Sequence, residues 1–508
     1  MNPAPSWLAA PADGVSSHPV SRLWLLVAGI CLPAIGFAWR YPLRGNEQQL
    51  TDIGKLAAYG REEFAGYVGG LALMFACYLL AIRESRRLSA RQALPSVVVG
   101  AVVLALVMAT MYPVNAIDLF LYTVRSRLLT GHGVNPLTAL PMDYPGDPLM
   151  RFASREWADD VSPYGPLWNL IAAPVTAISG DRILPALIGF KTLAVASVLA
   201  TGWVIARAVA ATRPEEATTA ALIFLWNPLV LWEGIGNGHN DVVMTLPLLL
   251  ALLAWTRRHD RWVVPWLVVA ALIKYVTVLL LPLAAVALWR RTEGRAARRQ
   301  LILWSGALTM IAAGIAFFPF YNLQAVRESV ANQGNIFLTS PAALVVGELR
   351  DRYAVDDLKH WCRVIGQSTL LLAVIGLMLW LWKRPDRLPR AAFEAIYLFL
   401  LVATWNFRGW YLVWPVAVAA LLPWGWPSWR IISWTAGALA GYGLFIWGWE
   451  WWGTDFLTVQ KAGVALMTGP TVLLSLTELV IEARARGRDR GEENATPDEL
   501  GLPTRVHD

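Results

Sequence analysis

The segment "VVVGAVVLALVMATMYPV" (97–114) runs directly into "NAIDLFLY" (115–122). The first part is apolar and close to the roughly 20 residues that an α-helix needs to cross a bilayer. The second part places Asp118 just where this predicted helix leaves the membrane. What this acid does depends on which side of the membrane it faces and which other side chains face it.

The composition of the whole chain indicates a membrane protein. Of its 508 residues, 56% are hydrophobic and only 16% are charged, and the mean hydropathy is +0.47. These values predict an all-α polytopic membrane protein, with apolar runs for about 12–14 transmembrane helices. The net charge of +7 comes from short arginine clusters between apolar runs, which is typical of cytoplasmic loops, so nucleic-acid binding is not expected.

The arginine clusters orient the chain, because short loops rich in Lys and Arg stay in the cytoplasm. The five densest are "RESRR" (83–87), "RRHDR" (257–261), "RRTEGRAARR" (290–299), "KRPDRLPR" (383–390) and "RARGRDR" (484–490). The predicted spans are then 23–40, 65–82, 94–112, 183–207, 217–232, 242–256, 301–320, 363–382, 391–404, 410–425, 431–449 and 461–483. The chain thus divides into an N-terminal cytoplasmic segment (1–22), a membrane domain (23–483) and a disordered cytoplasmic tail (484–508), and we expect it in the cell membrane.

Two segments do not fit a simple alternation of crossings. Segment 163–180 is apolar, but counting it as a span would place "RRHDR" outside, so we predict an interfacial or re-entrant helix within a long external loop (113–182). Segment 262–289 has arginine clusters at both ends. One crossing cannot begin and end in the cytoplasm, whereas two short helices meeting near Ile273–Val276 can.

Four polar clusters then lie on the external side. They are Asp118 with the loop up to "SPYGP" (162–166), "WNPLVLWEGIGNGHND" (226–241), Lys274, and "WNFRGWYLVWP" (405–415). Ionisable groups at membrane depth are costly and are functional candidates by default. The clusters therefore predict one vestibule that opens to the external side.

Each cluster also has a simpler structural explanation. Asp118 could serve solely as the cap of the helix that follows it. The segment "GNGHND" (236–241) could be simply a tight turn. Lys274 could extend to the interface from an ordinary span, and Arg408 could anchor lipid headgroups in an aromatic belt. We favour one functional site formed by all four clusters. The separate structural explanations do not account for why four polar clusters lie on the same side of the membrane.

The order of these motifs resembles the GT-C class of integral-membrane glycosyltransferases. The likeness is strongest to bacterial polyprenol-phosphate-mannose-dependent mannosyltransferases and covers roughly residues 94–425. It rests on Asp118, "LLTGHGVNP", "SPYGPLW", "WNPLVLWEGIGNGHND", "LIKYVTVLLLPL" and "FRGWYLVWP". In one respect the chain departs from such enzymes, whose first external loop usually follows the first span, whereas here it follows the third. Either an extra hairpin precedes the fold, or Asp118 is not the acid of that class.

The resemblance implies a reaction on the extracytoplasmic side, with the long loop 113–182 as the first catalytic loop. A sugar, with mannose favoured, passes from a polyprenyl-phosphate donor to a lipid or glycan acceptor, with inversion, and Asp118 acts as general base. Lys274 and Arg408 are the implied ligands of the donor phosphate. The implied sugar or acceptor ligands are His239, Asn240, Asp241, Tyr164 and Tyr411. We expect no cofactor, and no metal because the sequence has no set of clustered carboxylates. It also has no Gly-rich phosphate loop, so a nucleotide-sugar donor is not expected.

Two other functions stay open. A lipid or oligosaccharide transporter, such as a flippase, would also carry charged residues in a membrane cavity. The chain has no clear internal repeat of the kind that many transporters show, which favours the enzyme. A ligase or polymerase that joins preassembled glycans would also use arginines on the external side.

Overall fold

The structure, a computed structural model, describes residues 19–320, 339–453 and 456–494. Within those ranges the chain forms helices, and the only β-pairing is a single bridge between Pro42 and Met111. The α-helices are α1 (Pro19–Arg40), α2 (Ile53–Leu56), α3 (Arg61–Ser85), α4 (Ala90–Ala109), α5 (Asp118–His132), α6 (Ser154–Trp157), α7 (Pro166–Ser179), α8 (Ile183–Val209), α9 (Ala217–Leu225), α10 (Asp241–Thr256), α11 (Val263–Ile273), α12 (Leu281–Arg291), α13 (Arg295–Phe317), α15 (Pro341–Leu349), α16 (Val355–Lys383), α17 (Leu388–Leu398), α18 (Val413–Ala420), α19 (Trp426–Trp452) and α20 (Phe456–Asn494). Short 3-10 or π-helical turns are η2 (Pro141–Asp143), η3 (Met150–Ala153), η4 (Pro214–Glu216), η5 (Val230–Gly236), η6 (Asp260–Trp262), η7 (Tyr275–Leu280), η8 (Pro385–Arg387), η9 (Phe399–Ala403) and η10 (Gly409–Leu412).

The prediction of an all-α polytopic membrane protein is confirmed. In the described part of the chain, eight helices are long and apolar enough to cross a membrane, and a ninth span arises if the bent pair of η4–α9 and η5 counts as one. The eight are α1, α3, α4, α8, α13, α16, α19 and α20. The other predicted spans correspond to shorter or bent helices such as α10, α17 and α18, so fewer than the predicted 12–14 segments are long enough to cross alone.

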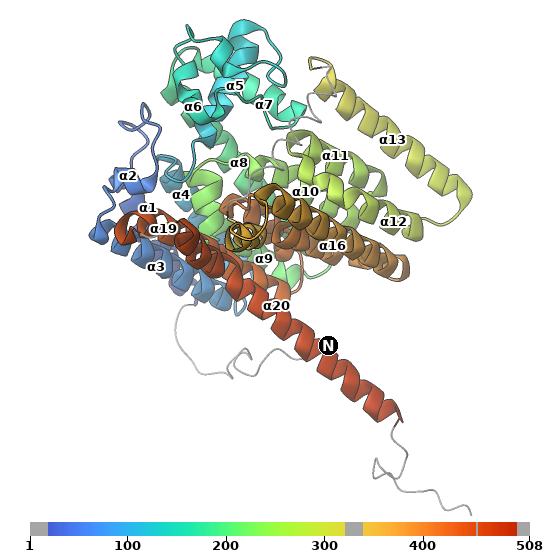
Figure 1. Ribbon diagram of the computed structural model, residues 1–508. Helices are drawn as coiled ribbons and strands as arrows, with labels where there is room; N and C mark the ends of the chain where they lie inside the picture. Colours follow the sequence, from blue (N-terminus) through green and yellow to red (C-terminus); the bar gives the residue numbers. More distant parts are fainter. Residues whose placement is uncertain (1–18, 321–338, 454–455, 495–508) are drawn as a thin grey trace, which may run out of the picture.

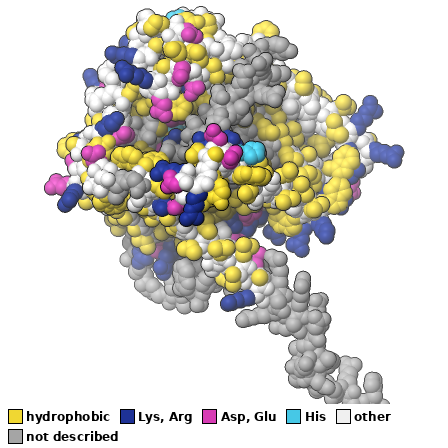
Figure 2. Space-filling model, viewed as in Figure 1, with side chains coloured by type: hydrophobic (Ala, Val, Ile, Leu, Met, Phe, Trp, Pro, Cys, Tyr) yellow, Lys and Arg dark blue, Asp and Glu magenta, His cyan; other side chains and the backbone are white. Residues whose placement is uncertain are grey.

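Two short helices, α9 and α18, lie inside the bundle, whereas long helices such as α13 lie on its outside. Every residue of α9 and of α18 is buried. By contrast, α13 presents Ile302, Leu303 and Met310 on its surface. Figure 2 shows how widely such hydrophobic side chains cover the outside of the bundle. The outer helices thus have the apolar surface that contact with lipid requires.

The predicted external loop folds as a separate cap. Helices α5, α6 and α7 gather at the top of Figure 1, and the C-terminal end of α20 points away from the bundle at the opposite end. Gly133, with a φ of +68°, ends α5 in the left-handed conformation that glycine favours. Segment 163–180 contains the short helix α7, as predicted.

An ion-pair cluster ties this cap together. The carboxylate of Asp147 accepts hydrogen bonds from Arg127 at 2.8 Å and, at 3.0 Å, from His132 when Nε2 carries a proton. Burial alone would raise the pKa of Asp147, but bonds from Arg127, the Leu149 N–H and His132 outweigh it and lower that pKa. The loop therefore has a fixed internal structure.

The predicted break in segment 262–289 is confirmed. Helix α11 ends at Ile273, Lys274 is extended, and α12 begins at Leu281 after the turn η7. The cap docks on this break, because the Gly165 N–H donates to the Ile273 carbonyl at 3.0 Å. A Cβ on Gly165 would stand 2.1 Å from the Leu272 carbonyl oxygen, so only glycine fits there.

The helices at the two ends of the predicted membrane domain extend beyond its predicted bounds. Helix α1 begins at Pro19, inside the predicted N-terminal segment, and residues 1–18 lie outside the described part. Helix α20 continues to Asn494, past the predicted start of the tail at residue 484. Arg, Ala and Glu are good helix formers, and a helix can continue past the membrane without a core to pack on. Residues 495–508 of the expected tail lie outside the described residues.

Candidate functional site

Asp118 is held by the cap. It is the first residue of α5, and its side chain is 20% exposed. The Tyr164 hydroxyl donates to Oδ1 at 2.9 Å. Burial and then the negative charge of Asp118 raise the pKa of Tyr164, so this hydroxyl stays protonated and donates. Ile117, and not Asp118, occupies the N-cap position, so helix capping does not explain the acid.

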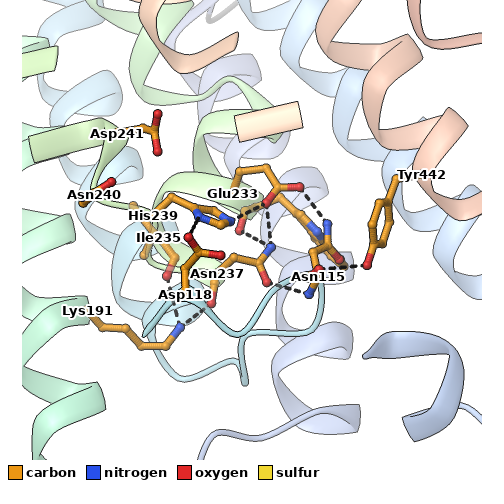
Figure 3. Close-up of polar contacts among 12 residues, drawn as sticks. Asn115, Asp118, Lys191, Glu233, Ile235, Asn237, His239, Asn240, Asp241 and Tyr442 are labelled. Atoms are coloured by element: carbon orange, nitrogen blue, oxygen red, sulfur yellow. Dashed lines mark hydrogen bonds and ion pairs between the residues drawn. The ribbon is translucent and has the colours of Figure 1, made fainter. Parts of the chain in front are cut away.

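A buried carboxylate, Glu233, lies behind Asp118. It sits on the π-helical turn η5 and accepts hydrogen bonds from the side-chain amides of Asn115 at 2.7 Å and Asn237 at 3.0 Å. The side-chain oxygen Oδ1 of Asn237 in turn accepts from the backbone N–H of Asn115 at 2.9 Å (Figure 3). These hydrogen bonds join Asn115, at the start of the predicted external loop, to the polar cluster 226–241.

The "GNGHND" segment combines a turn with deep burial. Gly238 has a φ of +72°, which favours glycine, as expected for a turn. All six residues of the segment (236–241) are nevertheless buried. The turn is therefore an interior part of the site and not a loop on the surface.

His239 lies between the two carboxylates. Its Nε2 is 3.3 Å from Glu233 Oε2, and its Nδ1 is 4.0 Å from Asp118 Oδ1 (Figure 3). The imidazole is 0% exposed and stacks on the ring of Trp410 at a centroid distance of 3.9 Å. Neither ring nitrogen forms a hydrogen bond of good geometry. A buried polar group in that state is available to a ligand or to water.

Asn240 is available in the same way. Its side chain is buried, and both amide atoms lack a hydrogen-bond partner. Its backbone N–H donates to the Tyr122 hydroxyl at 3.1 Å, which fixes the residue against α5. An amide with one donor group and one acceptor suits the hydroxyls of a sugar.

Asp241 and Lys274 form a buried ion pair. The Lys274 ammonium donates to both carboxylate oxygens of Asp241, at 2.8 and 2.9 Å, and the Trp414 indole donates to Oδ1 at 2.7 Å. The ammonium also lies 4.7 Å from the centre of the Tyr411 ring. Lys274 is 19% exposed and points to a buried acid, so extension to the membrane interface does not describe it. An ammonium has three donors, and one remains for a ligand.

Arg408 lies beside this group without an acidic partner in the described chain. Its guanidinium is 5.7 Å from the centre of the Trp410 ring, which also covers His239. Arg408 is partly exposed, as a ligand-binding or headgroup-binding arginine would be. The structure thus brings the predicted residues together in two linked groups, one around Asp118 and His239 and one around Asp241 and Lys274.

Sequence reasoning missed the residues that support this arrangement. They are Asn115, Glu233, Asn237, Tyr442, whose hydroxyl donates to the Asn115 carbonyl at 3.0 Å, and Lys191, whose ammonium donates to the Ile235 and Gly236 carbonyls (Figure 3). Lys191 is a lysine within a predicted span, and that was a usable signal. The two asparagines carried no comparable signal, because asparagine beside glycine is common in any turn.

Fold and site together define a multi-pass membrane protein with a buried polar site under a helical cap. The family model described as "Alpha-(1->6)-mannopyranosyltransferase, N-terminal domain" matches residues 26–290, which is more than half of the chain. The chain therefore belongs to this family. The match also confirms the resemblance to membrane mannosyltransferases.

Three named relatives agree with this assignment. The chain is 26% identical to alpha-(1->6)-mannopyranosyltransferase A of Mycobacterium tuberculosis over 330 residues, which is 61% of this chain and 62% of the relative. It is 27% identical to alpha-(1->6)-mannopyranosyltransferase A of Corynebacterium glutamicum, over 34% of each chain. It is also 27% identical to alpha-(1->6)-mannopyranosyltransferase B of that organism, over 40% of this chain and 36% of the relative. The matches thus span no more than 62% of these relatives' length.

Proposed function

We propose that this chain is a membrane mannosyltransferase that uses a polyprenyl-phosphate-linked donor and a lipid or glycan acceptor. The observation that carries the proposal is the partly exposed Asp118 carboxylate beside two buried side chains, His239 and Asn240, that lack hydrogen-bond partners. A base next to unused sugar-binding groups is what glycosyl transfer needs. Membership of the mannopyranosyltransferase family favours mannose as the sugar.

In the proposed reaction the acceptor hydroxyl oxygen attacks the anomeric carbon of the mannosyl group. The bond between that carbon and the phosphate oxygen breaks, and its electron pair leaves with the polyprenyl phosphate. Asp118 takes the hydroxyl proton, and Tyr164 keeps one carboxylate oxygen hydrogen-bonded while the other faces the acceptor. One displacement inverts the anomeric centre, so an alpha-(1->6) product, as in the relatives' names, would require a β-linked donor.

Cations near Asp118 would stabilise the leaving phosphate. We assign this role to Lys274, through its one remaining N–H, and to Arg408, which has no acidic partner among the described residues. His239, Asn240, Asp241, Tyr164 and Tyr411 would contact the sugar or the acceptor. Fixed charges aimed at a developing phosphate charge are an efficient form of transition-state stabilisation.

We place the site on the extracytoplasmic side, because short basic loops favour the cytoplasm. Cysteines introduced in intact cells at Asp159, in the cap, and at Glu293, in the opposite basic loop, would be treated with a membrane-impermeant thiol reagent. Both positions are exposed. We expect labelling at position 159 before lysis and at position 293 only after lysis, and the reverse pattern would overturn the orientation.

Transfer itself is tested with membranes that contain the protein, radiolabelled polyprenyl-phosphate mannose, and an α-mannoside acceptor. We expect label in the acceptor, attached through its 6-hydroxyl. Movement of the labelled lipid across the membrane without transfer would instead support a flippase. Transfer of a preassembled oligosaccharide but not of single mannose would support a ligase or polymerase.

A further inference from the structure

Arg125, on α5, is a buried arginine that none of these roles uses. Its side chain is only 2% exposed, and its Nε and Nη2 atoms are enclosed and lack hydrogen-bond partners. Its guanidinium lies 5.9 Å from the centre of the Tyr164 ring, whose hydroxyl binds Asp118. No carboxylate of the described chain pairs with it. The site therefore contains a buried positive charge that has no carboxylate within ion-pair distance, although Asp118 and Asp160 act on it from further away.

Two other arginines of low exposure, Arg127 and Arg430, are neutralised by direct ion pairs. Arg127, two residues further along α5, binds Asp147 at 2.8 Å and Asp181 at 2.6 Å. Arg430, which is also buried, binds Glu394 at 2.7 Å and Glu478 at 2.9 Å. A guanidinium remains charged in a protein interior, and an unpaired buried charge is strongly unfavourable. The contrast indicates that the partner of Arg125 is an anion that is not part of the chain.

The position of Arg125 on α5 suggests which anion this is. Asp118, Tyr122 and Arg125 are separated by four and three residues, so they share one face of the helix. The first and last are about 10 Å apart along the axis, at a rise of about 1.5 Å per residue. Tyr122, between them, contacts the backbone of Asn240. An anion bound at Arg125 would thus lie on the same face of α5 as the base at Asp118.

We propose that Arg125 binds the phosphate of the polyprenyl-phosphate carrier, with the sugar lying over Tyr122 and Asn240 toward Asp118. This assignment rests on the proposed function, and it makes Arg125 the principal phosphate ligand. Lys274 already forms a direct ion pair with Asp241, whereas Arg125 forms no direct ion pair in the described chain. A guanidinium grips a phosphate through two parallel N–H bonds, which also orients it.

The test measures binding of a ten-carbon prenyl phosphate to the purified full-length protein in detergent. The ten-carbon prenol, which has the same chain without the phosphate, is the matched ligand control. For wild type we expect saturable binding and a rise in melting temperature with the phosphate but not with the prenol. Equal binding of both ligands by wild type would overturn the proposal.

Two substitutions then separate ligand binding from a structural role. Arg125→Met should weaken binding of the prenyl phosphate about tenfold or more, as loss of a charge-assisted contact does. It should leave the melting temperature of the ligand-free protein unchanged or raise it, because an uncompensated charge is removed. Arg155→Met removes the same charge from an exposed position of the same cap and should change neither property.

Two results would contradict the assignment. One is wild-type affinity for the prenyl phosphate in Arg125→Met. The other is a lower melting temperature of the free protein together with an intact response to the ligand, which is the signature of a purely structural arginine. If the methionine variant does not fold, Arg125→Lys serves instead, and unchanged affinity there would also reject a two-bond phosphate grip. Binding needs no turnover, so failure of mannosyl transfer and failure of this site are distinguishable.

Discussion

The helices at the centre of the bundle are interrupted, whereas those on its outside are continuous. At the centre, α9 gives way to the π-helical turn η5 with a bend of 59°, and α11 stops at Lys274. On the outside, α13 runs unbroken for 23 residues, and only 11% of the residues in its most apolar part are buried. Irregular backbone inside a membrane is tolerated only where protein or water satisfies its polar groups. The breaks therefore mark where this protein keeps a polar interior.

The charged groups show the same contrast. Glu233, His239 and Asp241 are buried at the central breaks, each close to another charged or polar side chain. The exposed part of α13 carries its arginines at its first turn and is otherwise apolar. A substitution at the centre should thus affect chemistry or folding, and a similar one on the outside should do little.

The largest effect is expected at Asp118. Asp118→Asn keeps the shape of the side chain and the contact with Tyr164 but removes the proton acceptor. Mannosyl transfer should fall about 10²- to 10⁴-fold at unchanged protein abundance, as for loss of a general base. The control is Asp159→Asn, an exposed acid of the same cap, which should keep its rate. Near wild-type transfer by Asp118→Asn would move the role to another acid, with Asp241 next.

A smaller effect is expected at the second group of the site. Lys274→Met alone would leave Asp241 as a buried unpaired charge and destabilise the fold. The informative variant is therefore Lys274→Met with Asp241→Asn, which removes both charges. If Lys274 helps to bind the donor phosphate, the KM for the donor should rise about tenfold or more in the double variant. Kinetics like those of the wild type would assign the pair a structural role.

The contact between the cap and the central break should give an intermediate effect on stability. Gly165→Ala places a methyl group against the Leu272 carbonyl, so either the cap or the hairpin must shift. We expect a loss of about 1–3 kcal/mol in unfolding free energy, as for overpacking. Gly146→Ala, in the same loop with open space around it, is the matched control. Equal melting temperatures of the two variants would show that the cap does not depend on this contact.

The smallest effect is expected on the outer helices. Leu303→Ala on α13 removes a side chain that is 60% exposed, so unfolding free energy should change by less than about 0.5 kcal/mol. Leu248→Ala on α10 removes a fully buried one and should cost about 2–5 kcal/mol. Thermal unfolding in detergent compares them. A large cost at Leu303 would mean that α13 packs against protein, for instance a second copy of the chain.

The amino-acid sequence was sufficient for the class of protein and for the break at Lys274. Its twelve predicted spans include all eight long helices but do not distinguish them from the shorter ones. The class and the break follow from patterns along the chain, namely long apolar runs and arginine clusters on both sides of 262–289. The polar motifs likewise indicated Asp118, His239 and Lys274 as candidates. Such signals are local, so they do not depend on how distant parts of the chain pack.

Only the tertiary structure decided how these candidates are paired. Asp118 meets Tyr164, 46 residues away, and Lys274 meets Asp241, 33 residues away. The carboxylate that lies next to His239 is Glu233, and Arg125 keeps two buried nitrogen atoms without hydrogen-bond partners. Whether a charge is neutralised depends on which groups lie within a few ångströms when distant segments pack, and no pattern along one segment contains that information.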